Sequence, residues 1–249
     1  MSAVALPKAM GPLGKARIAG LLYVVCIAAG FCAEFFARGA IVDYRNAALT
    51  AQNILAAPVL YRMGFFADLV SFTSGILIAI IFYDLFKVVS RPVARTALTF
   101  AIVSNTVSIA ASIFCYAPLH ILGADYLHEF EPAQRESLAL LCLRLYQFAF
   151  SINLGLFSMD CFATAYLIAR STFLPRALGY LLAAGGFCYL FNSIVYFLPP
   201  NTLPDFFPYI YLPSLVAEAS IAVWLSTFGL NAAKWHALEN ARALLEGTH

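Results

Sequence analysis

Six stretches of the chain are almost continuously apolar, and short polar connections separate them. Because the hydrocarbon core of a bilayer is about 30 Å thick, each stretch is long enough to cross it as a helix. Helices and closed barrels are the structures that span a membrane. The pattern therefore predicts an all-α, polytopic membrane helical bundle with six transmembrane helices, at residues 17–37, 64–86, 93–117, 137–169, 177–198 and 209–230.

The connections are too short to hold a separate soluble domain, so we expect residues 1–249 to form a single six-helix transmembrane domain. Two of them have a recognisable pattern. In "RNAALTAQNILAAP", Asn46 is suited to cap a short surface helix that ends at Pro58. In "LPPNTLPDFFPYIYLP", the prolines and aromatic residues indicate a rigid cap at the membrane interface.

Composition supports the membrane assignment and excludes one class of partner. The chain is 62% hydrophobic and 11% charged, with a mean hydropathy of +0.83, whereas soluble domains carry about 25% charged residues. The net charge is only +2, without a Lys/Arg cluster interleaved with aromatic residues, which excludes nucleic acid as a partner. The six cysteines form no C-x-x-C pair, so we interpret them as buried apolar residues.

The distribution of basic residues predicts the orientation. Ten of the 15 Lys and Arg residues lie in the even-numbered connections and the two tails. Positively charged connections stay on the cytoplasmic side of a membrane. We therefore expect both termini in the cytoplasm, and the acidic connection "GADYLHEFEPAQRE" on the outer side.

Six ionisable residues fall in or at the rim of the outer half of the predicted bundle: the acids Glu34, Asp68 and Glu218 and the bases Arg38, Arg62 and Arg144. A charge at this depth costs about 2.5 kcal/mol or more unless it is paired or hydrated. We therefore expect these side chains to pair around a common cavity, with Gln147 and Tyr211 nearby. The alternative is that the polar residues only hold helices together.

A second polar group lies nearer the middle of the membrane. Asp160 and Asn153 share one face of the fourth apolar stretch, while Asn105 and Asn192 lie at mid-span in the third and fifth. The pattern predicts that Asp160 pairs with Asn105 or Asn192, and a protonated Asp hydrogen-bonded to amides is the simplest interpretation.

Several chemistries have no support in the sequence. G-x-S-x-G, H-E-x-x-H and G-x-x-x-x-G-K-[ST] do not occur, and the four histidines lie in a connection and in the C-terminal tail. Haem ligation needs histidines on facing helices. We therefore expect neither a cofactor nor a metal ion.

Four blocks resemble successive blocks of the bacterial membrane family catalogued as domain-of-unknown-function family 4386: "RIAGLLYVVCIAAGFCAEFFAR", "LYRMGFFADLVSF", "LIARSTFLPRALGYLLAAGGFCYL" and "AEASIAVWLSTFGLN". The resemblance implies a six-helix protein of the bacterial inner (plasma) membrane. It also implies that Glu34, Arg38, Arg62, Asp68 and Glu218 occupy characteristic family positions. The chain departs from the family at Asp160, where members often have His, and at Asn192, where they often have an acid.

Three functions fit the predicted outer-half pocket. The first is binding of an amphipathic or isoprenoid-like lipid, with Arg38, Arg62, Arg144, Gln147 and Tyr211 as ligand-binding residues. The second is an enzyme in which Asp68, Glu218 or Glu34 acts as a catalytic general acid on a membrane lipid or isoprenoid. The third is a proton-coupled transporter that uses Asp160. The expected partner in each case is a membrane lipid or another lipophilic small molecule.

Overall fold

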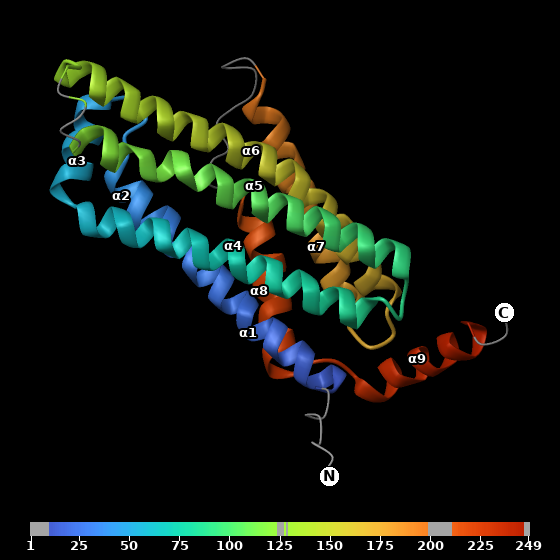
Figure 1. The fold of residues 1–249 in the computed structure, drawn as a ribbon. Coiled ribbons are helices and arrows are strands. Elements are labelled where there is room, and N and C mark those ends of the chain that lie inside the picture. Colours follow the sequence, from blue (N-terminus) through green and yellow to red (C-terminus); the bar gives the residue numbers. More distant parts are fainter. Residues whose placement is uncertain (1–9, 124–126, 128, 199–210, 247–249) are drawn as a thin grey trace, which may run out of the picture.

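The computed structural model describes residues 10–123, 127, 129–198 and 211–246, and its regular elements are all helical. Figure 1 shows their arrangement. In chain order they are α1 (Pro12–Phe31), the π-helix η1 (Cys32–Arg38), α2 (Gly39–Ile41), α3 (Ala47–Ala56), α4 (Pro58–Phe86), α5 (Arg91–Gly123), α6 (Pro132–Arg170), α7 (Arg176–Tyr196), α8 (Leu212–Thr227) and α9 (Ala232–Glu246).

The predicted fold class, a polytopic all-α membrane bundle, is confirmed. Five helical stretches are long and apolar enough to cross a membrane: Pro12–Ile41, Pro58–Phe86, Arg91–Gly123, Pro132–Arg170 and Arg176–Tyr196. The sixth predicted span corresponds to α8, which has only 16 residues and is bent by 95° from the following helix. At 1.5 Å per residue α8 is about 24 Å long, somewhat less than the bilayer core.

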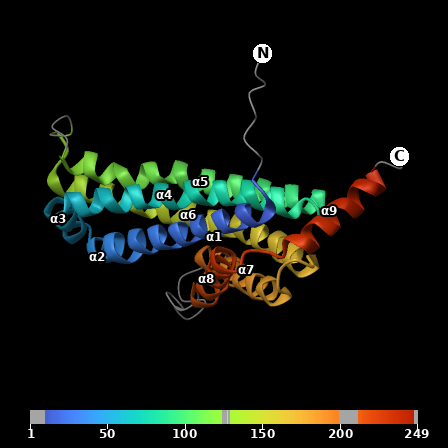
Figure 2. The same ribbon diagram turned by 90° about the horizontal axis from the view of Figure 1, so that it is seen from below.

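The membrane helices form a closed ring. Each one contacts its neighbour in the chain, in the order α1, α4, α5, α6, α7 and α8, and α8 packs back against α1. The view from below in Figure 2 places α7 and α8 on one side of α1 and places α4 and α5 on the other. Each membrane helix therefore borders the interior of the ring.

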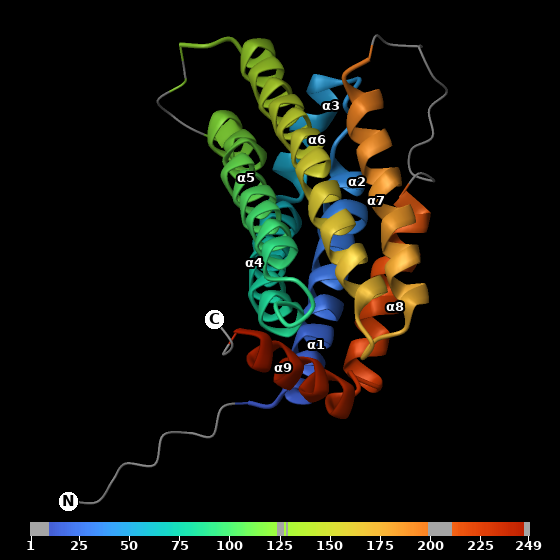
Figure 3. The same cartoon turned by 90° about the vertical axis from the view of Figure 1, so that its right-hand side faces the viewer.

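One end of the ring, called here the basic end, carries both the start of α1 and the helix α9. Lys15 pairs with Asp84 at 2.6 Å, and the Trp235 indole donates to the Leu85 carbonyl at 2.8 Å. The Asn231 amide donates to the Phe173 carbonyl, between α6 and α7, at 3.1 Å. Figure 3 shows α9 crossing beneath the long helices at this end. The chain from α1 to α9 therefore crosses the bundle an even number of times.

The opposite end, called here the α3 end, carries the predicted short surface helix. The Asn46 side chain accepts a hydrogen bond from the Leu49 amide at 3.0 Å and caps α3, which confirms the predicted cap. After the single residue Ala57, Pro58 begins α4, so α4 starts earlier than the predicted residue 64. Most of the proline-rich connection at 198–213 and part of the acidic connection at 123–136 lie outside the described residues.

Two features differ from the prediction. The first apolar stretch ends in the π-helix η1 instead of a continuous α-helix, and the C-terminal tail forms α9. The turn before α9 depends on Gly229, whose φ of 67° is a conformation that other residues rarely adopt. This conformation of Gly229 allows the chain to turn between α8 and α9, so that α9 runs along the basic end.

Candidate functional site

A buried ion-pair group lies near the α3 end and contains three of the predicted residues. The Arg38 guanidinium pairs with the Glu34 carboxylate at 2.8 Å. It also binds both carboxylate oxygens of Asp68, one of them at 3.2 Å. The Tyr146 hydroxyl donates to Asp68 at 3.4 Å, and the Tyr146 ring lies 5.1 Å from the guanidinium carbon. We call Glu34, Arg38, Asp68 and Tyr146 the Arg38 cluster.

The π-helix positions this cluster. Glu34 and Arg38 are both in η1, while Asp68 and Tyr146 come from α4 and α6. A π-helix carries one more residue per hydrogen-bonded turn and changes the direction of the side chains that follow it. Arg38 is consequently 7% exposed and Asp68 2% exposed. The cluster joins three membrane helices near the α3 end.

The other predicted basic residues do not join this cluster. Arg62 is exposed, and Gln147 is half-buried. Arg144 is exposed; it donates to the Tyr44 carbonyl at 2.6 Å and lies 5.7 Å from the Tyr44 ring. The prediction that these charges share one cavity with Asp68 and Glu218 is wrong, because the helices point them in different directions around the ring.

Glu218 lies instead in the wall of a separate cavity of about 250 Å³ in the interior of the ring. All six ring helices contribute to this wall, including Tyr23 from α1 and Asn105 from α5. The cavity is long and narrow: its lining residues run from Ser71 to Phe86 on α4, which is about 22 Å of helix rise. None of the Glu34, Arg38 and Asp68 side chains belongs to its described lining.

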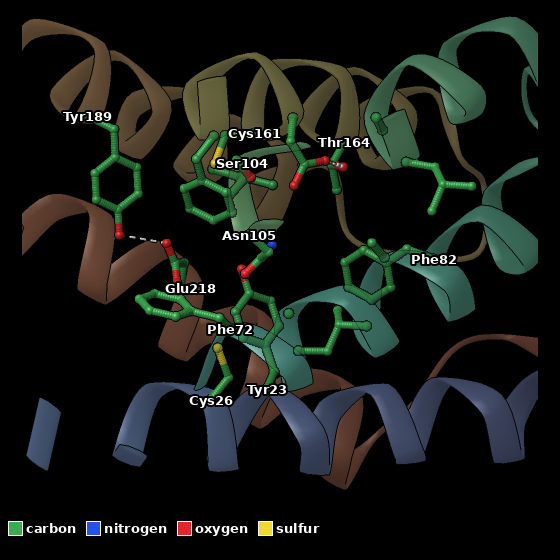
Figure 4. Close-up of a pocket in the computed structure, with 18 of the residues that line it drawn as sticks. Tyr23, Cys26, Phe72, Phe82, Ser104, Asn105, Cys161, Thr164, Tyr189 and Glu218 are labelled. Atoms are coloured by element: carbon green, nitrogen blue, oxygen red, sulfur yellow. Dashed lines mark hydrogen bonds between the residues drawn. The ribbon is translucent and has the colours of Figure 1, made fainter. Parts of the chain in front are cut away.

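Two carboxyl groups face the cavity. Glu218, on α8, accepts a hydrogen bond from the Tyr189 hydroxyl at 2.6 Å, and Figure 4 shows the two side chains meeting across the ring interior. Asp160, on α6, accepts a hydrogen bond from Thr164 at 3.0 Å. Asp160 is half-buried because it borders the cavity. Neither carboxyl is paired with a cationic side chain in the described part of the chain.

Amide groups complete the polar part of the wall. Asn105 donates its side-chain NH₂ to the Ala101 carbonyl at 2.8 Å. Asn153 is 8% exposed, lines the cavity, and has no hydrogen-bond partner among the described residues. Asn192 donates to the Tyr211 hydroxyl at 2.8 Å and not to Asp160, so the predicted Asp160–Asn192 pair is not formed. Asn105, Asn153, Asp160, Tyr211 and Glu218 therefore border one space.

The remaining wall is largely apolar and aromatic. Rings from α6, α7 and the start of α8 pack beside Glu218: Phe157 and Tyr189 lie 5.4 Å apart between centroids, and Tyr189 and Tyr211 lie 6.2 Å apart. Figure 4 shows Phe72 and Tyr23 below Glu218. Towards the basic end the lining is mainly apolar and aromatic, with polar groups added by Asp160 and Thr164 of α6. The apolar and aromatic members are Ile78, Ala79, Phe82, Tyr83, Phe86, Ala94, Ala97, Leu98 and Leu182.

Tyr189 is the main residue that the sequence interpretation missed. It lies four residues after Gly185, and Gly185 and Gly186 are both buried on α7. A tyrosine one turn beyond a buried glycine pair, inside an apolar span, needs a polar partner for its hydroxyl. That signal could have pointed to the facing carboxyl of Glu218. No group of three or more His, Cys, Asp or Glu side chains that could hold a metal ion occurs in the described parts of the chain.

A ring of membrane helices around a mostly apolar cavity, with a few carboxyl and amide groups in its wall, defines a multi-pass α-helical membrane protein. Residues 18–229 match the model of a family described as "Domain of unknown function (DUF4386)". The chain belongs to this family, as the sequence blocks predicted. No curated protein and no solved structure matches the chain.

Proposed function

We propose that this protein binds an amphipathic or isoprenoid-like lipid molecule in the central cavity. The observation that carries the proposal is the cavity itself, which is lined by residues of all six ring helices and has polar groups on only part of its wall. Ligand sites are typically concave, mostly apolar and supplied with a few polar groups that fix orientation. This site replaces the outer-half pocket expected from the sequence.

The cavity shape supports a ligand with one extended chain. A space of about 250 Å³ spread over roughly 22 Å of helix rise is too narrow for a multi-chain phospholipid. The apolar wall near the basic end, which includes Ala79 and Ala97, suits a hydrocarbon tail. Glu218, Asn105 and Asn153 suit a polar head nearer the α3 end.

A cavity-filling variant tests the proposal. Ala79 is buried and lines the cavity, so Ala79→Phe should fill the space that a tail would occupy. Ile80, the next residue, is 48% exposed, and Ile80→Phe serves as the control on the outer face. We expect native mass spectrometry of protein extracted from membranes to show a bound lipophilic molecule in the wild type and in Ile80→Phe, but not in Ala79→Phe.

The same comparison can overturn the proposal. If the wild-type protein carries no bound molecule under conditions that keep the bundle folded, the cavity is not a lipid site. If Ala79→Phe retains the molecule at the same occupancy as Ile80→Phe, the molecule binds elsewhere on the protein.

A second candidate function rests on Glu218. A carboxyl with a single hydroxyl donor, Tyr189 at 2.6 Å, in an apolar aromatic wall is the setting in which enzymes place a general acid. In this alternative Glu218 donates a proton to an alkene or epoxide of the bound lipid. Membrane lipids from cells that express Glu218→Gln should then lack a product that the wild type forms, and identical lipid profiles would remove this alternative.

A further inference from the structure

We infer that the central cavity selects amphiphiles with a positively charged head, such as a protonated long-chain amine or a quaternary ammonium. This inference rests on the proposed function and specifies the charge of its ligand. The site consists of Glu218, Asp160, Asn105 and Asn153, with aromatic rings around them. It differs from the site expected from the sequence, where arginines would hold an anionic head.

The charges in the cavity wall point to a cation. Two carboxyl side chains, Glu218 and Asp160, line the cavity, whereas no Lys, Arg or His side chain belongs to its described lining. Each carboxyl accepts one hydrogen bond from a hydroxyl group. Ionisable groups inside a membrane are costly without a partner, and a cationic ligand would supply that partner. An anionic head would find no cationic side chain in the described lining.

The amide groups favour the same ligand. Asn153 is buried, lines the cavity and has no hydrogen-bond partner among the described residues. Buried polar groups in proteins are almost always hydrogen-bonded, so an unpartnered amide in a cavity wall indicates a ligand atom. The side-chain oxygens of Asn153 and Asn105 are acceptors, which suit the N–H donors of an ammonium group.

Aromatic rings add a third contribution. Tyr189 binds Glu218 directly, and its ring packs on those of Phe157 and Tyr211. Figure 4 places Phe72 and Tyr23 on the other side of Glu218. The faces of aromatic rings attract ammonium groups, and rings combined with carboxylates are a recurrent site for quaternary ammonium ligands. The wall thus combines the groups that bind an alkylammonium ion.

Probes with one common chain and different heads test this inference. We would measure binding of decanol, decylamine, decyltrimethylammonium and decyl sulfate to the protein in nanodiscs of zwitterionic lipid, with empty nanodiscs as the blank. Decylamine is protonated at neutral pH, as a lysine side chain is. We expect the two cations to bind about tenfold or more tightly than decanol. Decylammonium gains hydrogen bonds to charged groups, whereas decyltrimethylammonium, which has no N–H, gains charge attraction and contacts with ring faces. Decyl sulfate should not compete with them.

Substitutions then identify the groups responsible. Glu218→Gln and Asp160→Asn should each reduce the ratio of decylamine affinity to decanol affinity, while decanol binding shows that the variant is folded. Asp84→Asn is the matched control, because Asp84 pairs with Lys15 and Lys87 at the basic end and does not line the cavity. The ratio of decylamine affinity to decanol affinity in Asp84→Asn should equal that of the wild type.

The outcomes separate this inference from the proposed function. Equal binding of decanol and decylamine to the wild type, both abolished by Ala79→Phe, would overturn the cation preference and keep the lipid site. An unchanged ratio in both carboxyl variants would also overturn it. If no probe binds the wild type above the blank, the lipid site and the cation preference both fail.

Discussion

At the scale of single residues, the Arg38 cluster is the most strongly buried ionic group described here. The Asp68 side chain is 3% exposed, whereas the Glu34 side chain is 44% exposed, so Asp68 is the partner that Arg38 depends on inside the bundle. Removing one partner of a buried pair leaves an uncompensated charge, which costs far more than the pair itself contributes. The cluster therefore makes helix packing sensitive to a change at Asp68.

Asp68→Ala should lower the free energy of unfolding by about 3 to 5 kcal/mol, because Arg38 then keeps only the partly exposed Glu34 as a partner. Unfolding midpoints in detergent, followed by circular dichroism, measure the change. Lys15→Ala is the control: it breaks a half-exposed pair with Asp84 and should cost no more than about 1 kcal/mol. Equal losses in the two variants would contradict the assigned role of Asp68.

A double substitution separates charge from packing. Arg38→Met with Asp68→Leu removes both charges and fills similar space, so it should recover most of the stability lost in Asp68→Ala. The same unfolding assay measures it. If the double variant is less stable than Asp68→Ala, the Arg38–Asp68 pair contributes more to stability than the two apolar side chains that replace it.

The sequence predicted which polar residues lie within the membrane helices, but it did not predict which of them meet. Depth along a helix follows from the rise per residue, and on that basis Asp68 and Glu218 fall at similar depths. The direction of each side chain around the ring depends on helix packing. Asp68 points to Arg38 and Glu218 points to the cavity, and no spacing within one helix contains that information.

At the scale of elements, the close packing of α1 and α8 closes the ring. A Cβ atom added at Gly20 of α1 would lie 2.3 Å from the Ser226 amide nitrogen and 2.7 Å from the Leu225 carbonyl carbon on α8. Both atoms belong to the backbone, so they cannot move without moving the helix. Gly20 therefore allows the first and last membrane helices to approach each other.

Gly20→Ala should lower the free energy of unfolding by about 1 to 3 kcal/mol, because overpacking outweighs the gain of up to about 1 kcal/mol from replacing a helical glycine. Thermal unfolding in detergent tests this. Gly123→Ala, at the end of α5, is the control, since no atom lies within 4 Å of an added Cβ there. A Gly20 variant as stable as the Gly123 variant would show that α1 and α8 can move apart freely.

Some helix boundaries have a local sequence signal that predicts them, and others have none. Helix α6 begins at Pro132, five residues before the predicted span, and local signals mark this start: Pro is favoured in the first turn of a helix, and the side chains of Glu131 and Gln134 form a capping box. The π-helix η1 has no comparable signature, because its hydrogen-bond pattern depends on packing around Ala37 and Arg38, which are buried. Helix α9 was missed because its sequence is polar on most sides, and contacts such as Trp235 with Leu85 hold it against the bundle.

At the scale of the whole molecule, the two ends of the ring differ in their number of Lys and Arg residues. The described basic residues at the basic end are Lys15, Arg17, Lys87, Arg91, Arg95, Arg170, Arg176, Lys234 and Arg242, against Arg38, Arg45, Arg62, Arg135 and Arg144 near the α3 end. The positive-inside rule places the basic end in the cytoplasm. This orientation remains a prediction.

Single engineered cysteines test the orientation. In a variant without the six native cysteines, Asn240→Cys on α9 and Gln52→Cys on α3 place thiols at exposed positions. A membrane-impermeant maleimide should label the α3 thiol in right-side-out vesicles and the α9 thiol only in inside-out vesicles. The reverse pattern would mean that the basic end faces outward.

The closure of the ring by α8 also determines when the protein can become complete during synthesis. Helix α1 is made first, and its contact partner α8 is made last among the membrane helices. At about 5 to 20 residues per second, α8 emerges roughly 10 to 40 s after α1. During this interval the face of α1 that contacts α8 in the finished protein lacks that partner. The cavity also lacks Glu218. A ribosome-bound chain that ends before residue 212 thus contains most of the bundle but not its finished interior.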